Sequence, residues 1–156
     1  RRLKMKTKYY IAYGSNMDRE QMAYRCPDAR LVGKGEIKGY ELLFKGSQTG
    51  SYATIEPKKN GIVPVLVWQI SRADEERLDL YEGYPTFYYK KNINVTVDGE
   101  ELKAMVYIMD EQRKLGVPSN RYFSVLDSAY WEFGFDYSIL ERAYDKSMEA
   151  VYGKMR

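Results

Sequence analysis

Stretches in which apolar and polar residues alternate occupy much of the first 110 positions, and they predict strands. The run at 8–13 is rich in β-branched and aromatic residues and stops at a glycine, as a first strand would. Four further β-like runs, separated by glycines, lie at 30–37, 40–45, 52–56 and 62–70. The pattern therefore predicts a sheet built from several short strands.

The clearest local signal is a hairpin in the middle of the chain. Apolar residues alternate over 93–97 and again over 102–108. Asp98-Gly99 lies between the two runs, and this dipeptide favours the two-residue turn whose twist matches that of paired strands. We expect two antiparallel strands here.

Four segments carry the capping residues that open helices. Each begins beside a side chain that can accept a hydrogen bond from the first turn: Asp18, Ser71, Ser119 or Asp136. A glycine or proline follows the first three segments, as is common where helices end. The predicted helices cover 18–24, 71–81, 119–133 and the segment after Asp136, in which Leu140, Tyr144, Met148 and Tyr152 would form one apolar stripe against the core.

The order of these elements is typical of an α+β protein. The strands follow one another too closely for repeated crossover connections. Many short strands with glycines at their corners favour a small mixed, strongly curled β-barrel flanked by helices. The chain contains no internal repeat or linker. We therefore expect a single domain over 1–156, with residues 1–4 preceding a natural start at Met5.

Composition excludes several classes of function. The chain has 156 residues, of which 44% are hydrophobic and 30% charged, values that suit one globular domain. Histidine is absent, which removes the commonest general base and every zinc site that needs imidazole. The one cysteine, Cys26, cannot form an internal disulfide and suits a reducing compartment. We expect it to be a buried, small hydrophobic residue.

Neither a membrane nor a nucleic acid is an expected partner. The longest apolar run, 62–68, contains a proline and is far shorter than the ~20 residues of a spanning helix. The N-terminus is charged but lacks the apolar segment of a secretory signal. Arg1, Arg2 and Lys4 account for the whole formal net charge of +3. The 16 tyrosines could stack on bases, but no basic bias accompanies them, and we expect a cytoplasmic protein.

Two segments contain residues whose chemistry is awkward to explain by packing alone. The first is Tyr13-Gly14-Ser15-Asn16, which follows the predicted first strand and precedes a helix. Glycine lets the backbone approach a ligand closely, and the three amides of Gly14, Ser15 and Asn16 could converge on an anion. The alternative is an ordinary capped turn, which is the commoner role of such a tetrapeptide.

The second segment is the end of the helix predicted at 71–81. Glu82 lies where Gly83 and Pro85 stop the helix, and there the negative end of the helix dipole disfavours a carboxylate. Turned inward among tyrosines, Glu82 would have a raised pKa and could act as an acid–base group without histidine. Turned outward, it would be an ordinary surface acid.

Neighbouring residues have simpler interpretations. Asp79 would share a helix face with Glu82, as in a metal pair or a carboxylate dyad, but a structural role at the helix end is favoured. Residues 74–77, Asp-Glu-Glu-Arg, are expected to form a solvated first turn that suits the helix dipole. Trp131 and Phe133 are expected in the core or in a subunit contact.

Three short motifs, taken in order, resemble the γ-glutamylcyclotransferase-like family. They are Tyr13-Gly14-Ser15-Asn16, Leu78-Asp79-x-x-Glu82-Gly83-x-Pro85-x-x-Tyr88, and Pro118-Ser119-x-x-Tyr122. Each motif is short, so the specificity lies in having all three at these separations, and the resemblance spans 9–140. It implies a small mixed β-barrel flanked by helices, with Glu82 and the 13–16 loop meeting in one cavity.

The resemblance also implies a reaction. In this family the α-amine of a γ-glutamyl group attacks its own γ-carbonyl, which yields 5-oxoproline and releases the attached amine or amino acid. By this likeness Glu82 is the catalytic acid–base residue and the expected ligand is a small γ-glutamyl compound. The residues implied in substrate binding are Tyr13, Gly14, Ser15, Asn16, Tyr88 and Tyr122.

Further expectations concern cofactors, the leaving group and the main alternative function. The reaction needs no metal or cofactor, because one carboxylate can move the proton and backbone amides can hold the charge. Bulky rings at Tyr84 and Phe87 would favour an apolar or aromatic leaving group. The main alternative is a non-catalytic small-molecule binding module with the same cavity. The natural substrate and the oligomeric state do not follow from the sequence.

Overall fold

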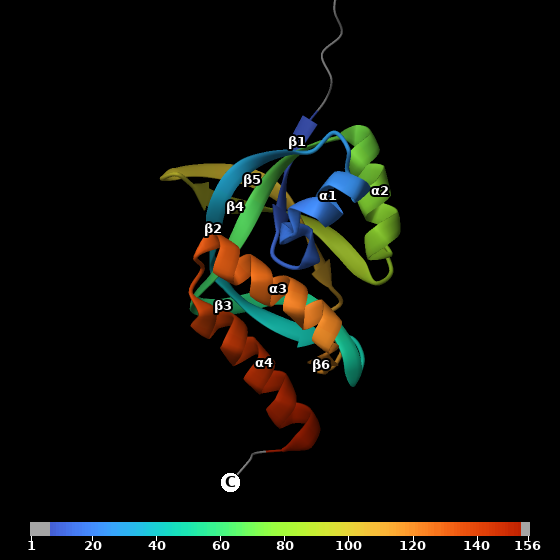
Figure 1. Cartoon of the computed structure of the whole chain (residues 1–156), viewed down its shortest axis with the longest axis vertical. Coiled ribbons are helices and arrows are strands. Elements are labelled where there is room, and N and C mark those ends of the chain that lie inside the picture. The colour runs from blue at the N-terminus through green and yellow to red at the C-terminus, as the bar shows by residue number, and fades with distance from the viewer. Residues whose placement is uncertain (1–6, 154–156) are drawn as a thin grey trace, which may run out of the picture.

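The computed structural model describes residues 7–153, which form a closed barrel with helices packed around it (Figure 1). The barrel strands are β1 (Thr7–Ala12), β2 (Arg30–Lys45), β3 (Thr49–Ser71), β4 (Tyr88–Val97) and β5 (Glu100–Met109). They follow the order β1-β5-β4-β2-β3, and β3 pairs with β1 to close the ring. The β1–β5 pair is parallel and the other pairs of the ring are antiparallel. The small mixed barrel predicted from the sequence is confirmed.

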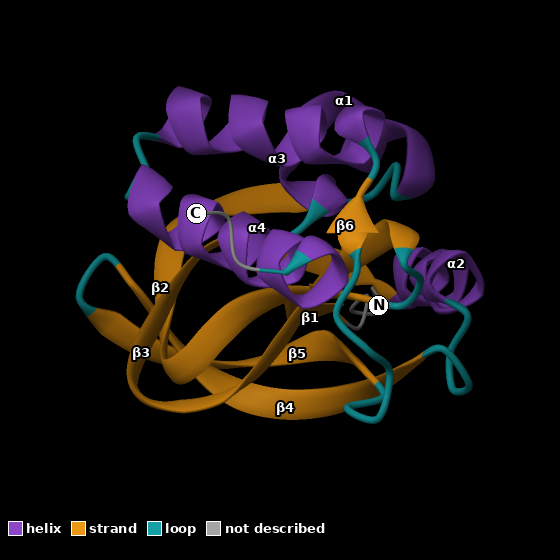
Figure 2. Cartoon of the chain, turned by 90° about the horizontal axis from the view of Figure 1, so that it is seen from below, coloured by secondary structure: helices purple, strands orange, loops and turns teal. Residues whose placement is uncertain are grey.

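Helices cover the barrel as the capping residues predict. They are α1 (Arg19–Arg25), α2 (Arg72–Glu82), α3 (Asn120–Phe133) and α4 (Tyr137–Tyr152). In Figure 2, α1 and α3 lie at the top, α4 lies below α3, and α2 lies at one side. Two small elements escaped the sequence analysis: the 3₁₀ turn η1 (Ser15–Met17) and the strand β6 (Val117–Pro118), which adds to the start of β3. Within 7–153 no helix is both long and apolar enough to cross a membrane.

The expectation of many short strands is wrong for the region 30–70. The runs 30–37 and 40–45 belong to one strand, β2, and the runs 52–56 and 62–70 belong to β3. The β2–β3 ladder shifts register between Lys38 and Tyr40, where Gly39 has φ of +82°. A glycine of this kind marks a β-bulge, which bends a strand without ending it. Gly39 therefore lies within β2 and does not end the strand.

The predicted hairpin is confirmed and is longer than the alternating pattern. β4 and β5 pair without a register shift from Tyr88 opposite Met109 to Val97 opposite Glu100. Asp98 and Gly99 both have positive φ, at 50° and 77°, as a type I′ turn requires. This turn fixes the register of β4, and so decides which of its side chains face the interior.

The expected solvated first turn of α2 is corrected at Asp74, which is completely buried. The Asp74 carboxylate accepts hydrogen bonds from the amides of Ser71 (3.2 Å) and Asp28 (3.3 Å), while the Ser71 hydroxyl accepts one from the Asp74 amide. This reciprocal capping box explains the burial, because backbone donors replace water around the carboxylate. The same side chain thereby holds the α1–β2 connection against α2.

The predicted stripe along α4 holds in its first half, where Tyr144 also packs against the core. Leu140 is buried, but Tyr152 is 63% exposed, and the face against the core continues instead through Ala143 and Ser147. Four residues turn an ideal helix by about 400°, so a strict four-residue spacing drifts around the surface by about 40° at each step. Trp131 is 73% exposed and is likewise not a core residue.

The core between the barrel and its helices is largely apolar, and Cys26 belongs to it. Cys26 is buried with its Sγ near the Asp74 carbonyl, and burial raises the pKa of its thiol to about 12. The thiol therefore stays protonated at neutral pH, which fits the expected packing role. The fully buried large side chains of the core include Ile11, Met17, Met22, Ile37, Phe44, Ile55, Leu66, Ile70, Leu78, Tyr107, Ile108 and Tyr130.

Candidate active site

A cavity of about 340 Å³ is lined by residues of β1, η1, β3, α2, β4, β5 and α3. It brings the three sequence motifs together, although they are separated by up to about a hundred positions. All seven site residues expected from the sequence line it: Tyr13, Gly14, Ser15, Asn16, Glu82, Tyr88 and Tyr122. Sequence reasoning missed several other lining side chains: Tyr10, Tyr52, Leu80, Tyr81 and Tyr107.

Glu82 reaches the cavity because α2 ends at this residue. Gly83 follows in the left-handed conformation, with φ of 66°, which glycine adopts without strain. Glu82 is partly buried, and burial raises the pKa of its carboxyl from 4.5 to about 7, against a smaller opposing effect of the Arg25 guanidinium. Within 7–153 the carboxylate has no hydrogen-bond partner that would lower this value. The group can therefore gain or lose a proton near neutrality.

The phenols around Glu82 use their hydroxyl groups elsewhere. Tyr13 donates to the backbone carbonyl of Tyr107 (2.5 Å), and the Tyr107 hydroxyl donates to Asp79 (2.6 Å). Tyr88 donates to the carbonyl of Ala53 (2.8 Å). Burial raises the pKa of all three phenols above its usual 10. They are uncharged at neutral pH and leave Glu82 as the ionisable group of the cavity wall.

Gly14 precedes η1 and lies directly beside Tyr122. Its φ is −122°, so the conformation itself does not demand glycine. A Cβ at this position would lie 3.0 Å from the Tyr122 hydroxyl and 3.5 Å from the Ala53 Cβ. The sequence suggested that the backbone at Gly14 approaches a ligand closely. In the structure it instead approaches the Tyr122 side chain of α3, so the 13–16 loop and α3 line the same cavity.

Asn16 contributes its backbone, because its side chain is already used within the protein. The buried carboxamide donates to the Tyr10 hydroxyl (2.9 Å) and accepts from Arg25 (2.5 Å), and the Asn16 carbonyl accepts from Trp68 Nε1 (3.1 Å). Among the described residues, no hydrogen bond uses the amides of Ser15 or Asn16 as donors. These two amides start η1 and are available to an anion.

Tyr88 and Tyr122 meet at one residue of β3. The Ala53 carbonyl accepts from Tyr88, and the Ala53 amide donates to the Tyr122 hydroxyl (3.1 Å). Since that hydroxyl already accepts a bond, its own proton is free for a ligand. Tyr89 points to the opposite side and donates to Glu111. The structure therefore settles that Tyr88, and not Tyr89, faces the cavity.

An aromatic wall borders the cavity on the side of β3 and β4. The Tyr52 ring lies edge-on to the rings of Tyr122 (5.2 Å between centroids) and Phe87 (6.2 Å), and Phe87 lies edge-on to Tyr88 (5.1 Å). Tyr84 does not line the cavity. Its ring instead lies beneath the Lys90 ammonium at 4.2 Å, so the expected contribution of Tyr84 to the pocket is not found.

Asp79 has the expected structural surroundings. Its carboxylate accepts hydrogen bonds from Tyr107 (2.6 Å) and Lys90 (3.1 Å), and thereby ties α2 to β4 and β5. It is directed to these partners and is not among the residues that line the cavity. Within 7–153 there is no cluster of acidic and cysteine side chains that could hold a metal ion.

Arg25 is the functional candidate that carried no signal in the sequence. It is the last residue of α1, a place where a basic residue simply suits the helix dipole. Its guanidinium nevertheless contacts both the 13–16 loop and the end of α2. Only the folded arrangement shows this link.

The fold and its cavity define a class of small mixed-barrel proteins in which one carboxylate and the loop after the first strand line a small-molecule pocket. The family model described as "Gamma-glutamyl cyclotransferase, AIG2-like" matches residues 10–132. The chain belongs to this family.

Similarity to individual proteins agrees with this assignment. The chain is 28% identical over 151 residues to the gamma-glutamylcyclotransferase of Homo sapiens and 29% identical over 152 residues to that of Bos taurus. Each match covers 91% of this chain and 77% of the relative. A solved structure named "Gamma-glutamyl cyclotransferase" superposes with a TM-score of 0.79 at 24% identity, covering 88% of this chain and 86% of that one, which shows the shared fold.

Proposed function

We propose that this chain converts a γ-glutamyl amine or γ-glutamyl amino acid into 5-oxoproline and the free amine, with Glu82 as the catalytic acid–base residue. The observation that carries the proposal is the carboxyl of Glu82, which lines the cavity and has a pKa of about 7. A group with this pKa is present in both protonation states at neutral pH, so it can first accept a proton and then return it.

The reaction needs one proton to move between two nitrogens of the same substrate. The α-amine adds to the γ-carbonyl carbon, and ionised Glu82 takes the proton that the nitrogen loses. Protonated Glu82 then gives this proton to the leaving nitrogen as the γ-amide bond breaks. The carboxylate is regenerated, and the new bond closes the five-membered lactam of 5-oxoproline.

The remaining groups of the cavity bind and hold the substrate. The free amides of Ser15 and Asn16 suit either the α-carboxylate or the oxygen that becomes negative during attack. The free proton of Tyr122 can reach a ligand acceptor on the same side. Because ring closure is intramolecular, holding the chain in a folded conformation supplies much of the rate enhancement. The aromatic wall of Tyr52 and Phe87 supplies apolar contacts for the rest of the substrate.

The decisive experiment is Glu82→Gln, assayed with a panel of γ-glutamyl amines and amino acids by mass spectrometry of 5-oxoproline. We expect a folded protein with a rate reduced by ~10²-fold or more, the usual scale for loss of an acid–base group. Glu76→Gln is the matched control, because Glu76 is an exposed acid of the same helix. Unchanged turnover in Glu82→Gln would exclude Glu82 from the mechanism.

The same panel separates catalysis from simple binding. A protein that binds these compounds in calorimetry, yet forms no 5-oxoproline between pH 6 and pH 9, would be the non-catalytic binding module. Turnover that Glu82→Gln removes, with ligand binding retained, would instead establish the enzyme.

A further inference from the structure

We propose that Arg25, at the end of α1, is a positioning residue that joins the 14–16 loop to the end of α2 and keeps Glu82 ready to accept a proton. The proposal rests on the function proposed above. It concerns a residue that does not line the cavity and acts through three neighbours that do: Asn16, Tyr81 and Glu82.

The guanidinium of Arg25 contacts two segments that line the cavity. Its Nη1 donates to Asn16 Oδ1 at 2.5 Å, and its Cζ lies 3.6 Å from the centre of the Tyr81 ring. The Tyr81 hydroxyl in turn lies 3.4 Å from Ser15 Oγ. One side chain thus connects two segments that are more than sixty positions apart.

On the loop side, Arg25 holds the residue that offers a free amide. Asn16 is buried, and its carboxamide oxygen has the Arg25 guanidinium as its partner. Loss of this donor would leave a buried acceptor unpaired, which a folded protein avoids by rearranging the segment. The amides of Ser15 and Asn16 would then lose their fixed direction.

On the helix side, Arg25 holds the residue immediately before Glu82. Tyr81 is 48% exposed, so packing alone does not fix its ring. The stacked guanidinium covers one face of the ring through a cation–π contact. Because Glu82 follows Tyr81 as the last residue of α2, the same contact restrains the direction of the carboxylate.

Arg25 is also the charge that acts on Glu82. The titratable groups that face Glu82 from the other elements are phenols whose pKa lies above the usual 10, and they are uncharged at neutral pH: Tyr10 and Tyr13 of the β1 segment, Tyr88 of β4, Tyr107 of β5 and Tyr122 of α3. Asp79, on the same helix as Glu82, is engaged by Lys90 and Tyr107. The cation of Arg25 favours ionised Glu82 and opposes the effect of burial.

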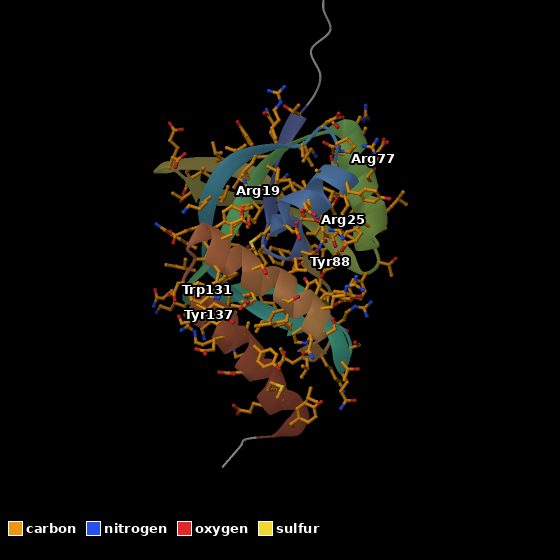
Figure 3. The ribbon with its side chains drawn as sticks, viewed as in Figure 1. Arg19, Arg25, Arg77, Tyr88, Trp131 and Tyr137 are labelled. Carbon is orange, nitrogen blue, oxygen red and sulfur yellow. The ribbon has the colours of Figure 1, made fainter. Side chains whose placement is uncertain are left out.

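A second arginine of α1 provides a matched control. Figure 3 shows Arg19 and Arg25 at opposite ends of the helix. Arg19 forms an ion pair with Glu132 and lies 5.5 Å from the centre of the Phe133 ring, on the side of α3. Arg19→Gln therefore removes the same charge from the same helix without touching the cavity.

The test is a ¹³C NMR titration of the Glu82 carboxyl without substrate, in the wild type, Arg25→Gln, Arg25→Lys and Arg19→Gln, with Glu82→Gln used to assign the signal. We expect the midpoint to move upward in Arg25→Gln and to stay unchanged in Arg19→Gln. The acid limb of kcat/KM should also move to higher pH, since each unit by which the pKa of Glu82 rises lowers the ionised fraction of its carboxyl about tenfold on the acid side. An unchanged midpoint in folded Arg25→Gln, or an equal shift in Arg19→Gln, would overturn the proposal.

Arg25→Lys tests whether Arg25 joins the 14–16 loop to the end of α2, even if Arg25→Gln fails to fold. An ammonium keeps the charge but cannot both stack on Tyr81 and reach Asn16 as the planar guanidinium does. We expect its midpoint to stay close to that of the wild type while KM rises several-fold, and a KM equal to that of the wild type would contradict the positioning role. Since the titration needs no turnover, it reports on Arg25 even if Glu82→Gln shows that the proposed reaction is wrong.

Discussion

Glu82→Gln should stabilise the fold while removing activity, because the ionised carboxylate is held in an unfavourable place. The carboxyl of Glu82 has a pKa of about 7 in the folded protein, against a usual value of 4.5. Between these two values the folded state binds more protons than the unfolded state. The free energy of unfolding therefore falls as the pH rises through this window, and the loss is complete above the folded pKa.

The size of the effect follows from the shift. One pKa unit corresponds to about 1.4 kcal/mol, so the shift of Glu82 costs the wild type about 3 kcal/mol once the group is ionised. Glutamine has the same shape and no charge. The stability gained by Glu82→Gln should thus be below about 1 kcal/mol at pH 5 and should grow by about 2–3 kcal/mol by pH 8.

Urea unfolding of the wild type and of Glu82→Gln at pH 5, 6, 7 and 8 measures this difference directly. Glu76→Gln, which changes an exposed acid on the same helix, should show a difference that does not vary with pH in this way. If the gain from Glu82→Gln were the same at pH 5 and pH 8, Glu82 would have an ordinary pKa and the reasoning about its burial would be wrong.

Three further substitutions test individual contacts. Gly14→Ala should lower the free energy of unfolding by about 1–3 kcal/mol and reduce substrate affinity, because the new methyl group would lie 3.0 Å from the Tyr122 hydroxyl. When stability is measured by urea denaturation in a double-mutant cycle, adding Tyr122→Phe should recover part of this loss. Asp74→Ala should cost about 2–4 kcal/mol by the same measurement, since it removes the acceptor of the buried Ser71 amide and of the part-buried Asp28 amide. Trp131→Ser should change stability by no more than about 0.5 kcal/mol, because this ring is 73% exposed, and a larger loss would show that the ring is covered in solution.

Local signals in the sequence were sufficient for the hairpin and the helix ends, including the place of Glu82 at the end of α2, whereas its inward direction was implied by the family resemblance. Asp98-Gly99 specifies a turn that needs no tertiary contact. Ser71 marks the start of α2 by its capping hydroxyl, and Gly83 marks the end by its left-handed conformation. The motif that ends α2 also places the Glu82 carboxylate at the negative end of the helix dipole, which disfavours its charge. These features depend on neighbours within a few positions, so a pattern can reveal them.

The features that were missed depend on contacts between distant positions. Gly39 looks like the end of a strand, but pairing with β3 continues on both sides of it and makes it a bulge. Asp74 looks like a surface acid until the amide of Asp28 approaches it from another element. Arg25 meets Tyr81 across more than fifty positions. No local pattern distinguishes these side chains from ordinary surface residues.

The barrel prepares Glu82 by occupying the hydroxyl protons of three of the phenols that surround it. Tyr13 and Tyr88 donate to backbone carbonyls, and Tyr107 donates to Asp79. Any of these phenols, if free to turn, could donate to the carboxylate and lower its pKa. These three phenols supply low polarity without supplying a hydrogen bond, and within residues 7–153 the charge that acts on Glu82 is that of Arg25. The same rings that close the core therefore set the proton affinity of the site, so a substitution that frees a phenol should lower the pKa of Glu82 even if the cavity keeps its shape.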